Sequence, residues 1–319
     1  MTRGPSDDLV LWERTAWGVR LTLNRPDKLN ALSAGLRDAL TDAVADATAD
    51  DGIRVIVIAG AGRAFCAGYD LSEQQPDSAW GWREVLRRDV AATLAILHCP
   101  KPVIAQVHGF AVAGGLELAM ACDLVVAAED AQLGEPEIRF GSAPVTLLMP
   151  FLIGQKKTRE LLLTGDLVNG TEAARIGLVN RAVPGERLAD EVDALADRLA
   201  RVDPDVMAPT KLMLNRAMDA AGFAAAAEMG LDLQSFVNMS NASREFDAIV
   251  RRDGLKAALA WRDARYDERL ADAGRTAPDE EIEPGGSASR SGRGRPGADP
   301  TGPTYLHRWS PRPVSPTPK

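Results

Sequence analysis

Residues 103–128 read VIAQVHGFAVAGGLELAMACDLVVAA, and they contain two apolar runs separated by glycines and a short polar interruption. The runs Pro102–Val107 and Leu124–Ala128 have the length and the β-branched residues of buried strands. Between them, Gly109–Gly115 is predicted to be a loop and Leu116–Ala121 a helix, because the glycines interrupt the apolar pattern. This order of strand, helix and strand indicates one repeat of an α/β fold.

The same alternation continues toward the N-terminus. Val19–Leu23 and Arg54–Ala59 are predicted strands, and Asn24–Asp27 has the composition of a turn. Ser33 is the expected N-cap of a helix that runs to about Asp50. Ser78–Leu97 is predicted to be a single helix before the next strand.

From about Thr146 the pattern becomes mostly helical. The expected helices are Lys156–Thr164, Thr171–Ile176, Arg187–Ala200, Asp205–Met218, Ala221–Ser240, Ser243–Arg251 and Leu255–Arg269. The chain is therefore expected to have an α/β core at residues 1–200 and a helical region at 201–270.

The predicted tail, residues 271–319, differs from the rest of the chain in composition and charge. Its last 35 residues contain eighteen Gly, Pro or Ser, and six Arg or Lys against one Asp. Such a segment cannot bury enough apolar surface to order itself, so a disordered tail is expected. Since the whole chain has a net charge of −8, the body is acidic, which argues against broad binding of nucleic acid.

Composition also restricts the cellular setting. The 319 residues are 45% hydrophobic and 26% charged, as expected for a globular protein with an ample core. No uninterrupted apolar run approaches the ~20 residues that a membrane helix needs. The first ten residues, MTRGPSDDLV, do not read as a targeting peptide, and three cysteines without metal spacing suggest a reducing compartment. A cytoplasmic protein without membrane or metal partners is expected.

Three stretches carry residues that could perform chemistry. Arg63–Asp70 has small residues after a strand, where backbone can approach a ligand, although a simple turn would read the same way. His108–Leu118 brings two glycines to a helix start, where unpaired N–H groups suit a negative oxygen; tight packing is the alternative. In Gly134–Ile138, a carboxylate could be partly desolvated, which would raise its pKa and let it donate a proton; an ordinary surface glutamate in a turn is the alternative.

Together these stretches resemble the enoyl-CoA hydratase/isomerase (crotonase) family. The resemblance begins at Asn24–Pro26, continues through Asn30–Leu32 and Ala64–Asp70, and is strongest across Val103–Glu137. It returns more weakly at 163–180 and covers about residues 9–269. It implies an α/β fold in which ββα repeats form a spiral, followed by a C-terminal helical region.

The resemblance also implies roles for particular residues. The backbone N–H groups of Tyr69 and Gly114 match the two donors that hold the thioester oxygen of an acyl-CoA. Glu117 matches the carboxylate that activates water, and Glu137 matches the one that delivers a proton to the α-carbon. Tyr69 is bulkier than the small residue usual at its position, and residues 141–148 depart from the glycine-rich family pattern.

The implied coenzyme A contacts form a larger set, with basic residues for the phosphates and the loop after Gly62 for the adenine. They are Arg25, Lys28, Arg63, Ala64, Cys66, Ala67, Gly68, Asp70 and Leu71. No separate cofactor is implied, because coenzyme A is part of the substrate. The resemblance further implies a homotrimer or homohexamer, with the helical region 201–270 packed between subunits, and a place in lipid or fatty-acid metabolism.

The activity that these residues imply is hydration of a 2-enoyl-CoA to a 3-hydroxyacyl-CoA by a hydro-lyase. An isomerase or an acyl-CoA hydrolase of the same family is the alternative, since it would use the same oxyanion site. A non-catalytic acyl-CoA- or RNA-binding protein that uses the basic tail is the alternative from another class. Acyl length is not implied by these residues.

Overall fold

The computed structural model describes residues 9–73 and 75–273, with side chains up to residue 266. Met1–Ala271 belong to one compact unit, and a second unit comprises Asp272–Lys319. Almost all of the predicted tail therefore lies outside the described residues.

The described elements alternate between strands and helices until about residue 200 and are helical thereafter. The strands are β1 (Val10–Arg14), β2 (Gly18–Leu23), β3 (Val55–Gly60), β4 (Val103–Val107), β5 (Phe110–Val112), β6 (Leu124–Ala128), β7 (Gln132–Gly134), β8 (Val168–Asn169) and β9 (Arg181–Val183). The α-helices are α1 (Ala34–Ala49), α2 (Ala79–Asp89), α3 (Ala91–His98), α4 (Gly114–Ala121), α5 (Met149–Ile153), α6 (Gln155–Thr164), α7 (Gly170–Arg175), α8 (Leu188–Ala200), α9 (Pro204–Ala220), α10 (Phe223–Val237), α11 (Asn241–Asp253) and α12 (Leu255–Ala273). The 3₁₀ helices are η2 (Pro26–Lys28), η3 (Pro136–Phe140) and η4 (Gly185–Arg187).

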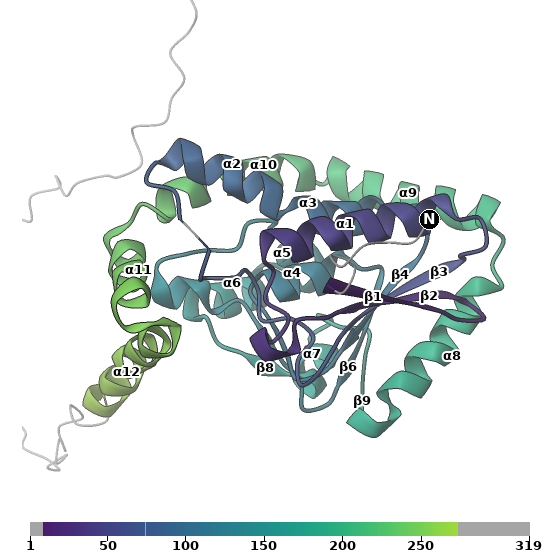
Figure 1. The fold of residues 1–319 in the computed structure, drawn as a ribbon. Helices are drawn as coiled ribbons and strands as arrows, with labels where there is room; N and C mark the ends of the chain where they lie inside the picture. Colours follow the sequence, from purple (N-terminus) through teal and green to yellow (C-terminus); the bar gives the residue numbers. More distant parts are fainter. Residues whose placement is uncertain (1–8, 74, 274–319) are drawn as a thin grey trace, which may run out of the picture. The chain divides into compact units, whose positions relative to one another are not determined.

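The larger sheet has the strand order β1-β2-β3-β4-β6-β9. β1 pairs antiparallel with β2, and the remaining neighbours are parallel. β3 has the sequence VIVIAG and is buried along almost its whole length, as expected for a central parallel strand covered on both faces. Helix α8 contacts β3, β4 and β6, while α1 contacts the neighbouring strands β1 and β2. Figure 1 shows α1 and α8 on opposite sides of this sheet.

The smaller sheet, β5-β7-β8, explains how two distant helical turns meet. After β4 the chain forms β5 and then α4, and after β6 it forms β7 and then η3, so one ββα-like unit is repeated. β5 and β7 are parallel, with Val112 paired to Gly134. The N–H of Ala113 donates to the Gly134 carbonyl at 2.9 Å. The starts of α4 and η3 therefore lie beside each other.

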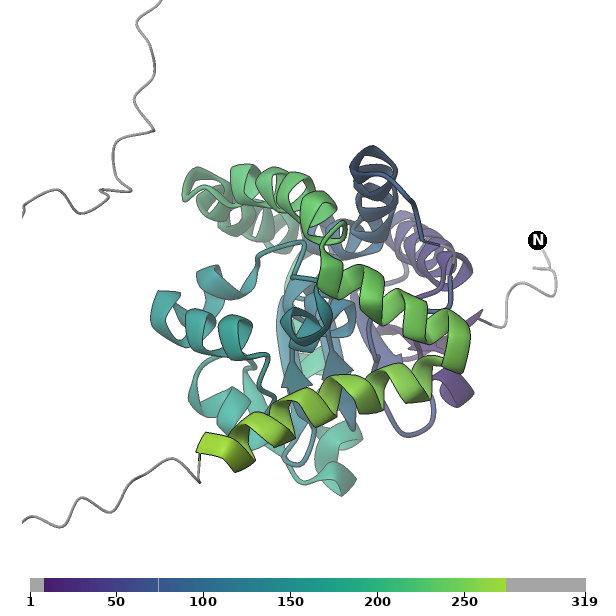
Figure 2. The same cartoon turned by 90° about the vertical axis from the view of Figure 1, so that its left-hand side faces the viewer.

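The C-terminal helices α11 and α12 pack against the core near two predicted site segments. Phe246, Ile249 and Ala258 form an apolar cluster with the partly buried Leu71 and Phe140. In Figure 2 these two helices, in light green, cross the side that faces the viewer. The segment that follows Tyr69 and the end of η3 are thus covered by the C-terminal region.

The predicted single helix Ser78–Leu97 is wrong, because the chain forms α2 and α3 with a break at Val90. Val90 has ψ −8°, and its N–H bonds to the carbonyls of both Leu86 and Arg88, which tightens the turn. The next turn resumes with the Leu94 N–H donating to the Val90 carbonyl. An apolar period of 3.6 continues through such a break, so the sequence pattern does not reveal it.

The predicted loop Gly109–Gly115 is wrong in part, since it contains β5 and the first residues of α4. The other short strands, β7, β8 and β9, were not predicted either. A strand of two or three residues has no readable period and forms only when its partner strand is in place.

Candidate active site

The segment from Cys66 to Tyr69 lies between β5 and the residues that precede α1. The Cys66 N–H donates to the Phe110 carbonyl at 2.9 Å, and the Gly68 carbonyl accepts from the Leu32 N–H at 2.8 Å. Gly68 has φ +87°, and a Cβ there would lie 2.6 Å from the Cβ of Ala113. Glycine therefore allows this segment to approach the start of α4.

The backbone next to Tyr69 lies close to the backbone nitrogen of Gly114. A Cβ built on Gly68, the neighbour of Tyr69, would lie 3.3 Å from the nitrogen of Gly114. Gly114 is the first residue of α4, and its N-cap Ala113 makes no side-chain capping bond. Within the described residues, neither the N–H of Tyr69 nor that of Gly114 donates to a protein acceptor. Two unpaired donors at a helix start can hold a negatively charged oxygen.

Glu117 lies one turn further along α4 and is only 1% exposed. Its Oε1 accepts hydrogen bonds from the Val145 N–H at 2.9 Å, the Thr146 N–H at 2.7 Å and the Thr146 hydroxyl at 2.9 Å. Its Oε2 accepts one from the Tyr69 hydroxyl at 3.3 Å. Burial raises the pKa of Glu117, while these four donors oppose the increase by stabilising the ionised form.

Glu137 belongs to η3 and is 8% exposed. Its Oε2 is buried and has no hydrogen-bond partner among the described residues. Burial, with a smaller contribution from the charge of Glu117, raises the pKa of Glu137 to about 8. A carboxyl group in this state is neutral near pH 7 and can donate a proton.

Glu135 is a buried acid to which the sequence analysis gave no role. It is 2% exposed, and its Oε2 also has no partner among the described residues. Burial, followed by the charges of Glu137 and Glu117, raises its pKa well above the ordinary value. Two glutamates on either side of Pro136 were the signal in the sequence that could have marked it.

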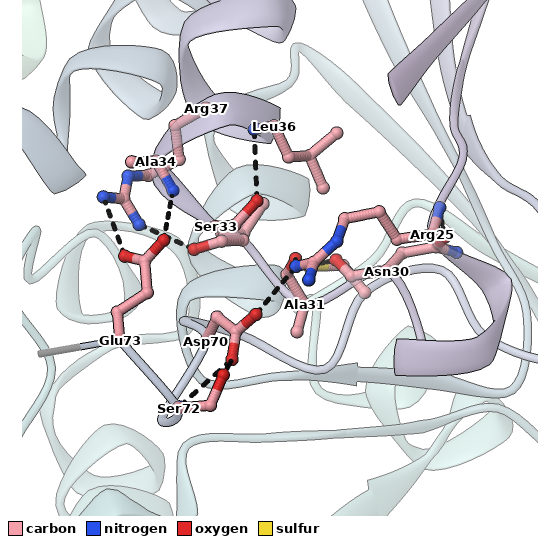
Figure 3. Close-up of polar contacts among 12 residues, drawn as sticks. Arg25, Asn30, Ala31, Ser33, Ala34, Leu36, Arg37, Asp70, Ser72 and Glu73 are labelled. Atoms are coloured by element: carbon pink, nitrogen blue, oxygen red, sulfur yellow. Dashed lines mark hydrogen bonds and ion pairs between the residues drawn. The ribbon is translucent and has the colours of Figure 1, made fainter. Parts of the chain in front are cut away.

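The predicted coenzyme A residues are brought together only in part. Arg25 donates from Nη1 to Asp70 Oδ2 at 2.9 Å and to the Ala31 carbonyl at 2.5 Å, and Asp70 Oδ1 accepts from the Ser72 hydroxyl at 2.6 Å. Figure 3 shows this ion pair. The side-chain amide of the buried Asn30 donates to the carbonyls of Ala64 and Phe65. These bonds hold the start of the loop at residues 64–71 against the segment that precedes α1.

The remaining members of that set differ in exposure. Lys28 and Arg63 are exposed and form no ion pair among the described residues. Ala67 and Leu71 are half-buried, while the side chains of Ala64 and Cys66 are fully buried. Burial raises the pKa of the Cys66 thiol to about 12, so this cysteine is a packing residue rather than a nucleophile.

Two further properties concern the described residues as a whole. Across residues 9–73 and 75–273, no cluster of three or more His, Cys, Asp or Glu side chains is arranged to hold a metal ion. No helix in this part of the chain is both long and apolar enough to span a bilayer.

The structure combines a mixed α/β fold with buried carboxylates close to the start of α4. Known proteins were compared with the chain to identify the class of protein that has these features. A family model described as enoyl-CoA hydratase/isomerase matches residues 17–257. The chain therefore belongs to the enoyl-CoA hydratase/isomerase family.

Individual relatives agree with this assignment. A crotonyl-CoA hydratase of Syntrophomonas wolfei is 40% identical over 56% of this chain and 70% of its own length. A mitochondrial enoyl-CoA hydratase of Pongo abelii is 33% identical over 78% of this chain and 83% of its own.

Solved structures establish the fold. An enoyl-CoA hydratase/isomerase from Xanthobacter autotrophicus Py2 has a TM-score of 0.78 at 41% identity, covering 81% of this chain and 98% of its own. An enoyl-CoA hydratase from Mycobacterium smegmatis has a TM-score of 0.76 at 29% identity, covering 85% and 97%. The expected crotonase fold with a C-terminal helical region is confirmed.

Proposed function

We propose that this protein is an enoyl-CoA hydratase, a hydro-lyase that adds water to a 2-enoyl-CoA and forms a 3-hydroxyacyl-CoA. The observation that carries the proposal is the pair of buried glutamates, Glu117 and Glu137. The charge of Glu117 raises the pKa of Glu137, and the start of α4 carries an amide without an acceptor. Hydration needs a base and an acid at one water molecule, together with a stabiliser for the enolate oxygen.

In the proposed reaction, the thioester oxygen accepts hydrogen bonds from the N–H groups of Tyr69 and Gly114. Water attacks the β-carbon, and the electron pair of the double bond moves through the α-carbon to that oxygen. The resulting enolate carries more negative charge than the substrate carbonyl, so the two donors favour it selectively. One such donor contributes ~3 kcal/mol to stabilisation of a transition state.

The two glutamates divide the proton transfers. Glu117, whose donors favour the ionised form, accepts a proton from the attacking water. Glu137, which burial keeps neutral near pH 7, gives a proton to the α-carbon as the enolate collapses. Glu117 then releases its proton to solvent and Glu137 takes one up, so both groups return to their starting protonation states.

Coenzyme A is proposed to bind along the loop formed by residues 63–71. Lys28 and Arg63 are the exposed basic side chains available for its phosphates, whereas Arg25 is already paired with Asp70. The acidic body otherwise repels an anionic ligand, so local cations at this loop are required. No cofactor beyond the substrate itself is part of the proposed reaction.

Product identification tests the reaction against its alternatives. The protein would be incubated with crotonyl-CoA, a 3-enoyl-CoA and a β-ketoacyl-CoA, and the products separated by mass and retention time. A 3-hydroxyacyl-CoA from crotonyl-CoA is the expected main product. Isomerised double bonds, free coenzyme A, or binding without turnover would instead support the isomerase, the hydrolase or the non-catalytic alternative.

Assembly as a trimer or hexamer in the cytoplasm is the remaining part of the proposal. Large apolar side chains on α9 and α10 are more than half exposed in the single chain: Val206, Leu212, Met213, Leu214, Met229, Leu233 and Phe236. Apolar surface of this kind favours burial against another subunit. A mass measurement in solution that gave only a monomer at micromolar concentration would contradict the proposed assembly.

A further inference from the structure

The two oxygens of Glu117 differ in how much of their hydrogen-bonding capacity is used. Oε1 already accepts three hydrogen bonds, from the Val145 N–H and from the N–H and hydroxyl of Thr146. Oε2 accepts one, from the Tyr69 hydroxyl. Because Oε1 has no lone-pair direction left for another donor, a water molecule activated by Glu117 must bond to Oε2.

The phenol that reaches Oε2 is held from two sides. The ring of Tyr69 lies so close to Gly114 that a Cβ there would be 2.6 Å from Cε2. The guanidinium of Arg37 lies 5.9 Å from the centre of the ring, within the range of a cation–π contact. Tyr69 therefore cannot turn away freely from Glu117.

Arg37 is itself fixed by its neighbours. It donates to the Leu32 carbonyl at 2.6 Å and forms ion pairs with Asp89 at 3.0 Å and with Glu73 at 3.5 Å. Figure 3 shows Arg37 directed toward Glu73. A chain of contacts from α1 and α2 thus ends at the carboxylate on α4.

We propose that the Tyr69 side chain is a positioning residue for Glu117, in addition to the oxyanion role proposed for its backbone N–H. Its hydroxyl orients Oε2 toward the attacking water and favours the ionised carboxylate. This inference rests on the proposed hydration, in which Glu117 is the base.

The electrostatic setting is consistent with a phenol that remains a donor. Burial, and then the charges of Glu117 and Asp89, raise the pKa of Tyr69 well above its ordinary value, while Arg37 lowers it. The tyrosine hydroxyl in turn lowers the pKa of Glu117 against the effect of burial. The other ionisable groups around this pair are Arg37 on α1, Asp89 on α2, Glu73 in the intervening loop, and Glu135 and Glu137 at η3.

Tyr69→Phe tests the proposal, because it removes the hydroxyl and keeps the ring against Gly114. We expect kcat for crotonyl-CoA to fall about tenfold to a hundredfold, as for the loss of a hydrogen bond to a charged group, with KM changed less than about threefold. Since a lost donor raises the pKa of Glu117, the acidic limb of the kcat–pH profile should move to higher pH. Tyr266→Phe, the same change on α12, is the matched control and should leave both readouts unaltered.

A double-variant cycle separates positioning from a general structural effect. If Tyr69 acts through Glu117, then adding Tyr69→Phe to Glu117→Gln should lower kcat no further than Glu117→Gln alone. Full additivity, or a Tyr69→Phe protein with wild-type kcat and pH profile beside an inactive Glu117→Gln protein, would overturn the inference. A Glu117→Gln protein with wild-type activity would instead overturn the proposed function.

Discussion

Glu117 and Glu137 are both buried acids of the same site, but their surroundings differ sharply. Glu117 accepts four hydrogen bonds, from Val145, Thr146 and Tyr69, whereas Oε2 of Glu137 has no partner among the described residues and a single backbone hydrogen bond opposes the rise of its pKa. Burial is the main cause that raises the pKa of both groups, and the charge of Glu117 adds to it for Glu137. The number of donors is therefore what distinguishes a carboxylate suited to act as a base from one suited to act as an acid.

The largest effect is expected when either carboxylate becomes an amide. Glu117→Gln and Glu137→Gln should each lower hydration of crotonyl-CoA about a hundredfold or more, because general acid and base catalysis contribute about 10²–10⁴-fold. Release of 3-hydroxybutyryl-CoA is the measurement, and circular dichroism checks that the fold persists. If both variants kept full activity, Glu117 would not be the catalytic base and Glu137 would not be the catalytic acid.

Activity should next depend on pH through Glu137. Its pKa of about 8 means that the acid is protonated below that pH and ionised above it. We therefore expect kcat to fall as pH rises through about 8. A profile that stays flat from pH 7 to 10 in wild-type protein would show that proton donation by Glu137 is not required.

The free energy of unfolding should also depend on pH through Glu137, and its raised pKa determines the sign of that dependence. Since the folded-state pKa of Glu137 lies above the ordinary value of 4.5, the folded protein binds more protons than the unfolded chain between about pH 4.5 and 8. The stabilising contribution is present below that window and is lost as pH rises through it. The urea midpoints measured at pH 5 and pH 8 should differ less in Glu137→Gln than in wild type. The same two midpoints measured for Glu135→Gln give the contribution of the neighbouring buried acid.

A smaller effect is expected from the donors of Glu117. Thr146→Val removes the hydroxyl bond to Oε1 and leaves both backbone donors, so kcat should fall by about threefold to tenfold. Thr158→Val is the matched control, because its hydroxyl donates to the carbonyl of Gly154, the N-cap residue of its own helix α6. A Thr146→Val loss as large as that of Glu117→Gln would mean that the hydroxyl, and not the set of donors, determines the base.

The smallest effect is expected at residues that touch neither glutamate. Lys28→Ala and Arg63→Ala should raise KM by a few-fold each at low ionic strength, with kcat unchanged and the difference reduced by salt. Lys156→Ala, an exposed lysine on α6, serves as the control. A change in kcat without a change in KM would argue against a phosphate contact.

Much of the fold could be predicted because it depends on local patterns. The buried strands β3, β4 and β6 were marked by uninterrupted apolar runs, and Ser33 caps α1 by accepting from the Leu36 N–H, as its position before the helix predicted. The C-terminal helices were also predicted, although α10 ends at Val237 because Ser240 caps the next helix. The division at Val90 and the short strands of the second sheet escaped prediction because they leave the apolar period unchanged or too short to read.

In the candidate site too, the features that could be predicted are those that lie in local sequence motifs. Glycines at 68 and 114 and acids at 117 and 137 stand within local motifs, so the sequence by itself determined which residues to test for an oxyanion site and for a water pair. It also determined the α/β class, since buried strands and amphipathic helices are visible in composition and period. The catalytic roles of the residues at 68, 114, 117 and 137 stay predictions that the variants above test.

Only the tertiary structure decided the surroundings that differentiate the two acids. The bonds to Glu117 come from residues 28, 29 and 48 positions away in the chain, and the desolvation of Glu135 and Glu137 depends on what packs over η3. Proton affinity depends on donors, charges and water within a few ångströms, and chain folding, rather than any local pattern, brings these neighbours together.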